Sequence, residues 1–94
     1  VKQELNGVNP KNLEDARALI AKGNLAFQKS EFNESIRLAS EANQKVETAE
    51  GYALLGASEY RLGNYSVAEE AYLLGKRLDA DNQKILIGLG TVQA

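Results

Sequence analysis

The chain has 94 residues, of which 44% are hydrophobic and 26% are charged, values that are typical of one small soluble domain. Its 11 basic and 13 acidic residues give a net charge of -2, and neither sign gathers into a block. The sequence therefore lacks the basic patch of a nucleic-acid-binding protein, and no apolar run reaches the length of a membrane span. The first residue is Val1 instead of methionine, which favours an excised domain or a processed chain.

Two residue types that many enzymes use for catalysis are missing from the sequence. The absence of cysteine excludes disulfides and thiolate metal sites, and it leaves both a cytoplasmic and a bacterial periplasmic location open. The absence of histidine removes the usual general base and the commonest metal ligand, so no Ser-His or Cys-His nucleophile exists. We therefore expect a protein that is not an enzyme and that uses no metal or cofactor.

Apolar residues recur at steps of three and four along almost the whole chain, which is the pattern of amphipathic helices. The first helix would begin after Asn12, or alternatively after Asn9 with Pro10 in its first turn. Residues 62–65 form a turn after the third helix, and residues 79–82 end the fourth helix and cap the fifth. The five predicted apolar faces cover residues 13–27, 32–46, 52–60, 65–78 and 85–92. No stretch alternates as a strand would, so the sequence predicts an all-α fold.

Glycine and aromatic residues repeat with a long period. Gly23, Gly56 and Gly90 recur at nearly equal intervals, and Phe32 and Tyr65 each follow one of these glycines at the same distance. Two of the predicted helices fit into one period. A period of about 34 residues that contains two helices is typical of the tetratricopeptide repeat.

The residues around the glycines also resemble this family. Residues 52–56 read Tyr-x-x-Leu-Gly and residues 86–90 read Leu-x-x-Leu-Gly, which is similar to the family motif of the first helix. Ala68 with Tyr72 one helical turn later resembles the motif of the second helix. The resemblance implies an antiparallel helix-hairpin solenoid of five helices that winds into a right-handed superhelix. It divides the chain into a flexible segment 1–9 and a domain 10–94, with repeats at about 13–47 and 48–81 and a half repeat at 82–94.

In such a solenoid, the resemblance implies that the first helices of successive repeats line a concave surface. The side chains expected there lie about one residue away from the packing face of each first helix. They are Ile20, Asn24, Phe27, Gln28, Ala53, Ala57, Tyr60, Arg61, Lys84, Ile87 and Thr91. Small, aromatic and amide side chains with a few cations suit an extended peptide or a helix of a partner protein.

The function predicted from this surface is non-catalytic protein-protein binding or scaffolding within a larger assembly protein. The alternative is a purely structural helical spacer that supports another domain of the parent chain. Binding is favoured because Phe27 and Tyr60 would otherwise be exposed aromatic residues without a reason.

Three other motifs are weaker. A dinucleotide-binding interpretation of the glycines in residues 84–94 would need a third glycine where Gln93 stands, and a β-α-β unit around it. Residues 79–83 resemble a calcium loop, but the central glycine and the closing glutamate are missing. The clamp with which some family members hold a C-terminal carboxylate would need a lysine in place of Ile20 and an asparagine in place of Leu54.

The last predicted helix has no second helix after it to complete a third repeat. Leu86 and Leu89 are therefore expected to be partly uncovered, with Gly90 forming a flat groove between turns. Because burying a leucine side chain stabilises by roughly 1.5–3 kcal/mol, such a face favours association. The sequence predicts weak self-association through this helix.

Overall fold

A computed structural model describes residues 9–94, which form five α-helices and no strand. The helices are α1 (Pro10–Gln28), α2 (Phe32–Lys45), α3 (Ala49–Arg61), α4 (Tyr65–Leu78) and α5 (Gln83–Val92). The prediction of an all-α fold with five helices is therefore confirmed for this part of the chain. The predicted flexible segment 1–9 lies outside the described residues, except for Asn9.

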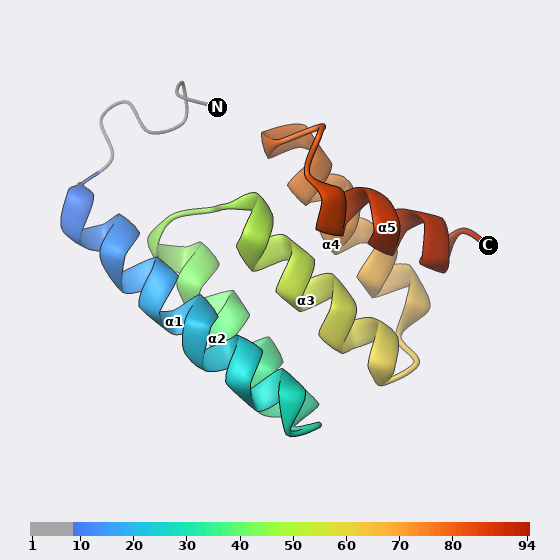
Figure 1. The fold of residues 1–94 in the computed structure, drawn as a ribbon, viewed down its shortest axis with the longest axis horizontal. Helices are drawn as coiled ribbons and strands as arrows, with labels where there is room; N and C mark the ends of the chain where they lie inside the picture. Colours follow the sequence, from blue (N-terminus) through green and yellow to red (C-terminus); the bar gives the residue numbers. More distant parts are fainter. Residues whose placement is uncertain (1–8) are drawn as a thin grey trace.

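The helices form two layers (Figure 1). In the view of Figure 1, α1, α3 and α5 lie in front and run in a similar direction, while α2 and α4 lie behind them. The chain makes two antiparallel hairpins, α1 with α2 and α3 with α4, and α2 packs against α3 to join them. The last helix, α5, packs against both α4 and α3. This is the stacking of helix hairpins that the repeat predicts.

Side chains that cap the helices explain where α1 and α5 begin. The Asn9 side chain accepts a hydrogen bond of 2.9 Å from the backbone N–H of Lys11, and Pro10 is the first residue of α1. The helix thus begins at the alternative start, and Asn12 lies inside it. Asn82 caps α5 in the same way, because its side chain accepts from the N–H of Ile85 at 3.1 Å. Each cap stabilises its helix by about 1 kcal/mol.

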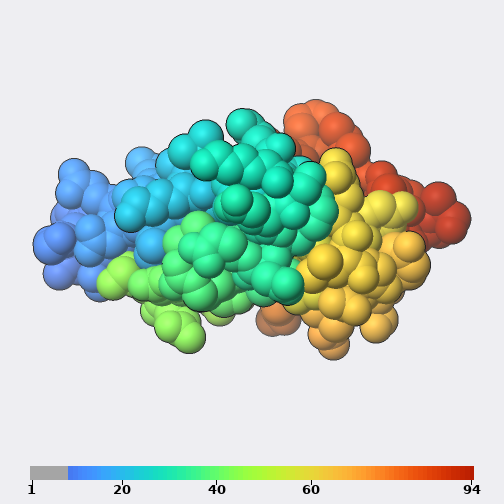
Figure 2. All heavy atoms as spheres, turned by 90° about the horizontal axis from the view of Figure 1, so that it is seen from below, coloured from blue at the N-terminus to red at the C-terminus, as the bar shows by residue number. Residues whose placement is uncertain are grey.

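The turns inside the two hairpins are built alike. Ser30 and Gly63, which occupy equivalent positions of the two repeats, both have positive φ angles, of 62° and 86°. Glycine adopts this left-handed conformation without cost, whereas a serine there is strained. Both turns lie at the same end of the molecule, and Figure 2, which views this end, shows them next to each other in teal and yellow.

Two glycines let an aromatic ring insert between the helices of the front layer. The ring of Tyr72, on α4, packs against Gly56 of α3 and Gly88 of α5. A Cβ atom on Gly56 would lie 2.8 Å from Cζ of Tyr72, and one on Gly88 would clash with the same ring. A Cβ atom on Gly90 would have no neighbour within 4 Å. A close approach that needs glycine therefore exists at Gly56 and not at Gly90.

A pair of serines joins the two hairpins inside the core. The hydroxyl oxygens of Ser35, on α2, and Ser58, on α3, are 2.6 Å apart, and both residues are fully buried. Ser35 also donates a hydrogen bond of 2.9 Å to the carbonyl oxygen of Phe32. Because a hydroxyl has one proton, Ser58 must be the donor to Ser35. The contact between the hairpins thus includes a buried hydrogen bond that Ser58 donates to Ser35.

The expectation that Leu89 is uncovered is wrong. Only 6% of its surface is exposed, and it packs in a core cluster with Ala68 and Tyr72 of α4. The reason is visible at the equivalent position of the previous repeat, where Leu55 packs against the core of the first hairpin. This position of the repeat faces the preceding hairpin, so no following helix is needed to cover it. Leu86, by contrast, is 41% exposed.

Substitutions of two glycines by alanine should have opposite effects on stability. Gly56→Ala should lower the free energy of unfolding by about 1–3 kcal/mol, because the new methyl group overpacks against Tyr72. Gly90→Ala should raise it by up to about 1 kcal/mol, because alanine has the higher helix propensity and meets no neighbour. Urea denaturation followed by circular dichroism measures both changes. A Gly56→Ala variant as stable as the wild type would contradict the tight ring contact.

The serine pair should behave as a coupled unit. Ser35→Ala removes the acceptor of the buried Ser58 hydroxyl, which should cost about 1–3 kcal/mol of unfolding free energy. The double variant Ser35→Ala/Ser58→Ala removes both hydroxyls and should be more stable than Ser35→Ala alone. Denaturation midpoints of the four proteins of this cycle provide the measurement. Additive losses would mean that the two hydroxyls are not coupled.

Candidate functional site

The three helices of the front layer line an open hollow of about 640 Å³. All eleven residues that the sequence predicts for the concave surface line it. From α1 these are Ile20, Asn24, Phe27 and Gln28; from α3 Ala53, Ala57, Tyr60 and Arg61; and from α5 Lys84, Ile87 and Thr91. The structure thus brings together residues that lie far apart in the chain, near its beginning, its middle and its end.

Small residues on the front helices give the hollow its depth. Ala53 and Ala57 lie one turn apart on α3, and Gly88 lies on α5. Since these residues fill little space, the ring of Tyr72 reaches the hollow from the back layer. Burial raises the pKa of the Tyr72 hydroxyl above its usual value. The floor is therefore apolar and carries a neutral phenol.

Four residues of this hollow were not predicted from the sequence: Glu50, Leu54, Tyr72 and Gly88. Tyr72 and Leu54 are buried, and the periodicity assigns such residues to packing. Gly88 and Tyr72 lie on different helices, and nothing in their sequence spacing indicates that they are in contact. Two of the predicted residues, Ile20 and Ala53, are also buried and belong mainly to the core.

The two predicted aromatic residues are packed more closely than the sequence suggests. Phe27 is half-buried and meets Phe32 edge to face, with ring centroids 5.3 Å apart. Tyr60, also half-buried, stacks at a tilt on Tyr65 with centroids 5.1 Å apart. Each ring thus packs on the first residue of the next helix, which is a structural reason for its presence. The expectation that Phe27 and Tyr60 would be exposed unless they bind a partner is therefore wrong, because packing within each hairpin already accounts for both rings.

Arg61, at the end of α3, reaches across to the first hairpin. Its guanidinium carbon lies 4.9 Å from the ring centroid of Phe27 and 5.5 Å from that of Phe32. Such cation-π contacts hold the group in place while its N–H edges stay free to donate. None of the ion pairs within residues 9–94 involves Arg61. This end of the hollow therefore presents an ordered cation without a carboxylate partner from the described residues.

The other end of the hollow carries charges of both signs. Glu50, in the first turn of α3, and Lys84, in the first turn of α5, both line it. The Asn82 side chain lies beside them, with its amide nitrogen 3.5 Å from the Glu50 carboxylate. The charges of Glu50 and Lys84 cancel at this end. The net positive charge of the lining therefore comes from Arg61 at the other end.

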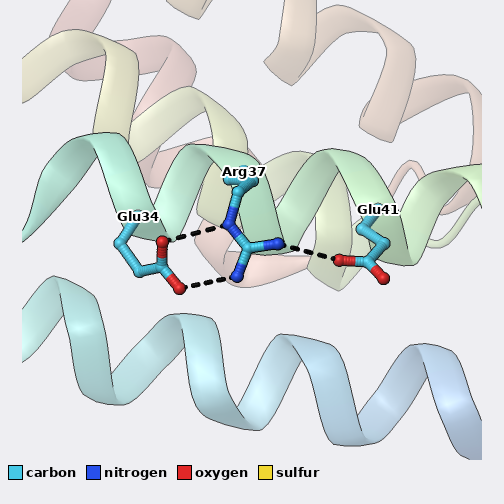
Figure 3. Close-up of polar contacts among 3 residues, drawn as sticks. All are labelled: Glu34, Arg37 and Glu41. Atoms are coloured by element: carbon cyan, nitrogen blue, oxygen red, sulfur yellow. Dashed lines mark hydrogen bonds and ion pairs between the residues drawn. The ribbon is translucent and has the colours of Figure 1, made fainter.

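Several acidic side chains of the protein are held away from the hollow. On α2, Arg37 bonds Glu34 at 2.7 Å and Glu41 at 3.2 Å, and these three residues form a ladder along the surface of the helix (Figure 3). The hydrogen bond from Arg37 lowers the pKa of the Glu34 carboxyl group. Glu59, two residues before Arg61, accepts from the Asn64 amide at 2.8 Å. These carboxylates are therefore engaged by neighbours other than Arg61.

In the described part of the chain, no group of three or more acidic side chains is arranged to hold a metal ion. None of the five helices there is both long enough and apolar enough to span a membrane. No protein-family model, curated protein or solved structure matches this chain. The hollow is therefore the feature of the molecule that points to a function.

Proposed function

We propose that this chain is a repeat module of the tetratricopeptide type that binds an extended peptide or a helix of a partner protein in its hollow. One observation carries the proposal: three helices from successive repeats bring eleven side chains of a single repeating stripe to one hollow. Its volume of about 640 Å³ lies within the range of about 300–1,000 Å³ that is usual for ligand pockets.

The chemistry of the lining fits this class of ligand. Ala53, Ala57 and the ring of Tyr72 offer an apolar floor for a side chain of the partner. Asn24 and Gln28 on α1 offer amide groups that can both donate hydrogen bonds to a peptide backbone and accept them from it. The module is proposed to act by binding, without catalysis and without a cofactor.

A second function has its own support. The stacking of Phe27 on Phe32 and of Tyr60 on Tyr65 explains these aromatic residues by packing alone. A structural spacer that holds another part of a larger protein would need nothing more. The two functions differ in whether the hollow is occupied, so a variant that fills the hollow distinguishes them.

Ala57→Trp should weaken binding strongly without unfolding the protein. A display library of random peptides is selected on the wild-type protein, and the affinities of the selected peptides are measured by fluorescence anisotropy. Because the indole ring occupies the floor of the hollow, the affinity should fall at least about thirtyfold, the equivalent of about 2 kcal/mol. The exposed residue Arg77 on α4 does not line the hollow, so Arg77→Ala provides a control that should bind as the wild type does.

The melting temperature of Ala57→Trp, measured by circular dichroism, shows whether the variant is folded. If selected peptides bind Ala57→Trp normally and lose affinity for Arg77→Ala, the binding surface lies elsewhere. If repeated selections yield no peptide that binds, the spacer function is supported instead.

We infer that the protein self-associates weakly through α5, and that the contact uses Leu86 and not Leu89. Leu86→Lys should abolish concentration-dependent association in sedimentation velocity experiments and should leave the fold intact, because this side chain is 41% exposed. Leu89→Lys is the matched contrast, and it should unfold the protein because it buries an unpaired charge. A wild-type protein that stays monomeric over a hundredfold concentration range would refute this inference.

A further inference from the structure

We propose that the hollow selects an extended peptide segment that carries an acidic side chain at one end and an apolar side chain about two residues away. The inference rests on the proposed function and adds to it the charge and the length of the ligand. Arg61 binds the carboxylate, and the floor formed by Ala57, Gly88 and Tyr72 takes the apolar side chain.

The charge of the ligand follows from the two ends of the hollow. Arg61 is the one cation of the lining that is held over aromatic rings, at 4.9 Å and 5.5 Å from their centroids. A guanidinium that is already ordered loses little entropy when it binds, and its planar edge matches a carboxylate. At the opposite end, Lys84 and Glu50 have opposite charges and favour neither sign. A ligand that complements these charges therefore carries one acidic group, at the Arg61 end of the hollow.

The length of the ligand follows from α3. The residues of α3 that line the hollow extend from Glu50 to Arg61, which is about 16 Å at about 1.5 Å per residue. An extended chain covers this distance with about five residues, at about 3.3 Å each. The apolar floor lies between the two ends. When the acidic residue of the peptide binds Arg61, a residue near the middle of the peptide therefore lies over Tyr72.

The carboxylate is expected to come from an aspartate or glutamate side chain. A C-terminal carboxylate is usually held by several donors that converge on it, such as backbone N–H groups in a nest. Arg61 is a single cation at its end of the hollow, with the amide of Gln28 beside Phe27 on the same wall. This set of groups fits a side-chain carboxylate on a backbone that continues past it.

The test uses a matched pair of peptides that are acetylated and amidated at their ends. One is a peptide selected on the wild-type protein, and the other has glutamine in place of its acidic residue. The selected peptides should share an acidic residue at one position, and its change to glutamine should weaken binding about tenfold. In Arg61→Gln the two peptides should bind equally, with the affinity that the glutamine peptide has for the wild type.

Several controls make the test specific. Lys76→Gln removes an exposed cation that does not line the hollow, and it should leave the preference for glutamate unchanged. Arg61→Lys keeps the charge but loses the planar fork, so it should retain only part of the preference. Added salt should weaken the glutamate peptide more than the glutamine peptide. Thermal melting of Arg61→Gln checks that loss of the cation-π contacts has not unfolded the protein. An unchanged affinity of this variant for the glutamine peptide shows that its hollow still binds a peptide.

The outcomes separate this inference from the proposed function. If peptides bind the wild-type protein and lose affinity for Ala57→Trp, but show no preference for an acidic residue, the inference fails and the proposed function stands. The selected peptide is also measured with a free C-terminal carboxylate. If it binds only in this form and not when amidated, the assignment to a side chain is overturned. If no peptide binds, both fail.

Discussion

The insertion of the Tyr72 ring between α3 and α5 is the contact on which the arrangement of the front layer depends. The ring comes from α4 in the back layer and touches Gly56 and Gly88, where any larger residue would clash. Because it packs on both helices, it fixes the distance between them, and it also becomes the floor of the hollow. Packing and candidate site therefore share the same atoms. A change that loosens this contact would alter the width of the hollow as well as the stability of the fold.

The contacts at the turns show how a repeat can acquire a feature that only one copy has. Phe27 packs on Phe32 in the first hairpin, and Tyr60 packs on Tyr65 at the equivalent positions of the second. Arg61 adds a cation over the first pair, from the neighbouring hairpin. The contact joins the hairpins at the end where the two turns lie side by side (Figure 2). A stabilising contact between repeats thereby also orders a cation at the rim of the hollow.

How much the sequence could predict depends on whether a feature repeats. Five helices follow from apolar periodicity, and the regular recurrence of the glycines allows equivalent positions to be chosen in each repeat. That is why every residue of the predicted stripe lines one hollow. Tyr72 in the floor could not be found in this way, because its exposure to the hollow needs small residues on two other helices. The burial of Leu89 was missed for a related reason, since the period does not say whether a position faces its own hairpin or the preceding one.

The distribution of charge explains how an acidic protein can present a cationic end of a groove. The chain has a net charge of -2, so its overall field repels an acidic ligand slightly. At an ionic strength of about 0.15 M, charges more than about 8 Å apart are largely screened, so the local groups decide. Near Arg61, Glu59 is bonded to Asn64, and on α2 the carboxylates of Glu34 and Glu41 are bonded to Arg37. These three carboxylates have donors of their own, and no ion pair among residues 9–94 involves Arg61. An incoming carboxylate therefore meets an ordered cation that forms no ion pair within the described residues. The same pairing makes the preference local, because it depends on one arginine and two aromatic rings and not on the net charge of the protein.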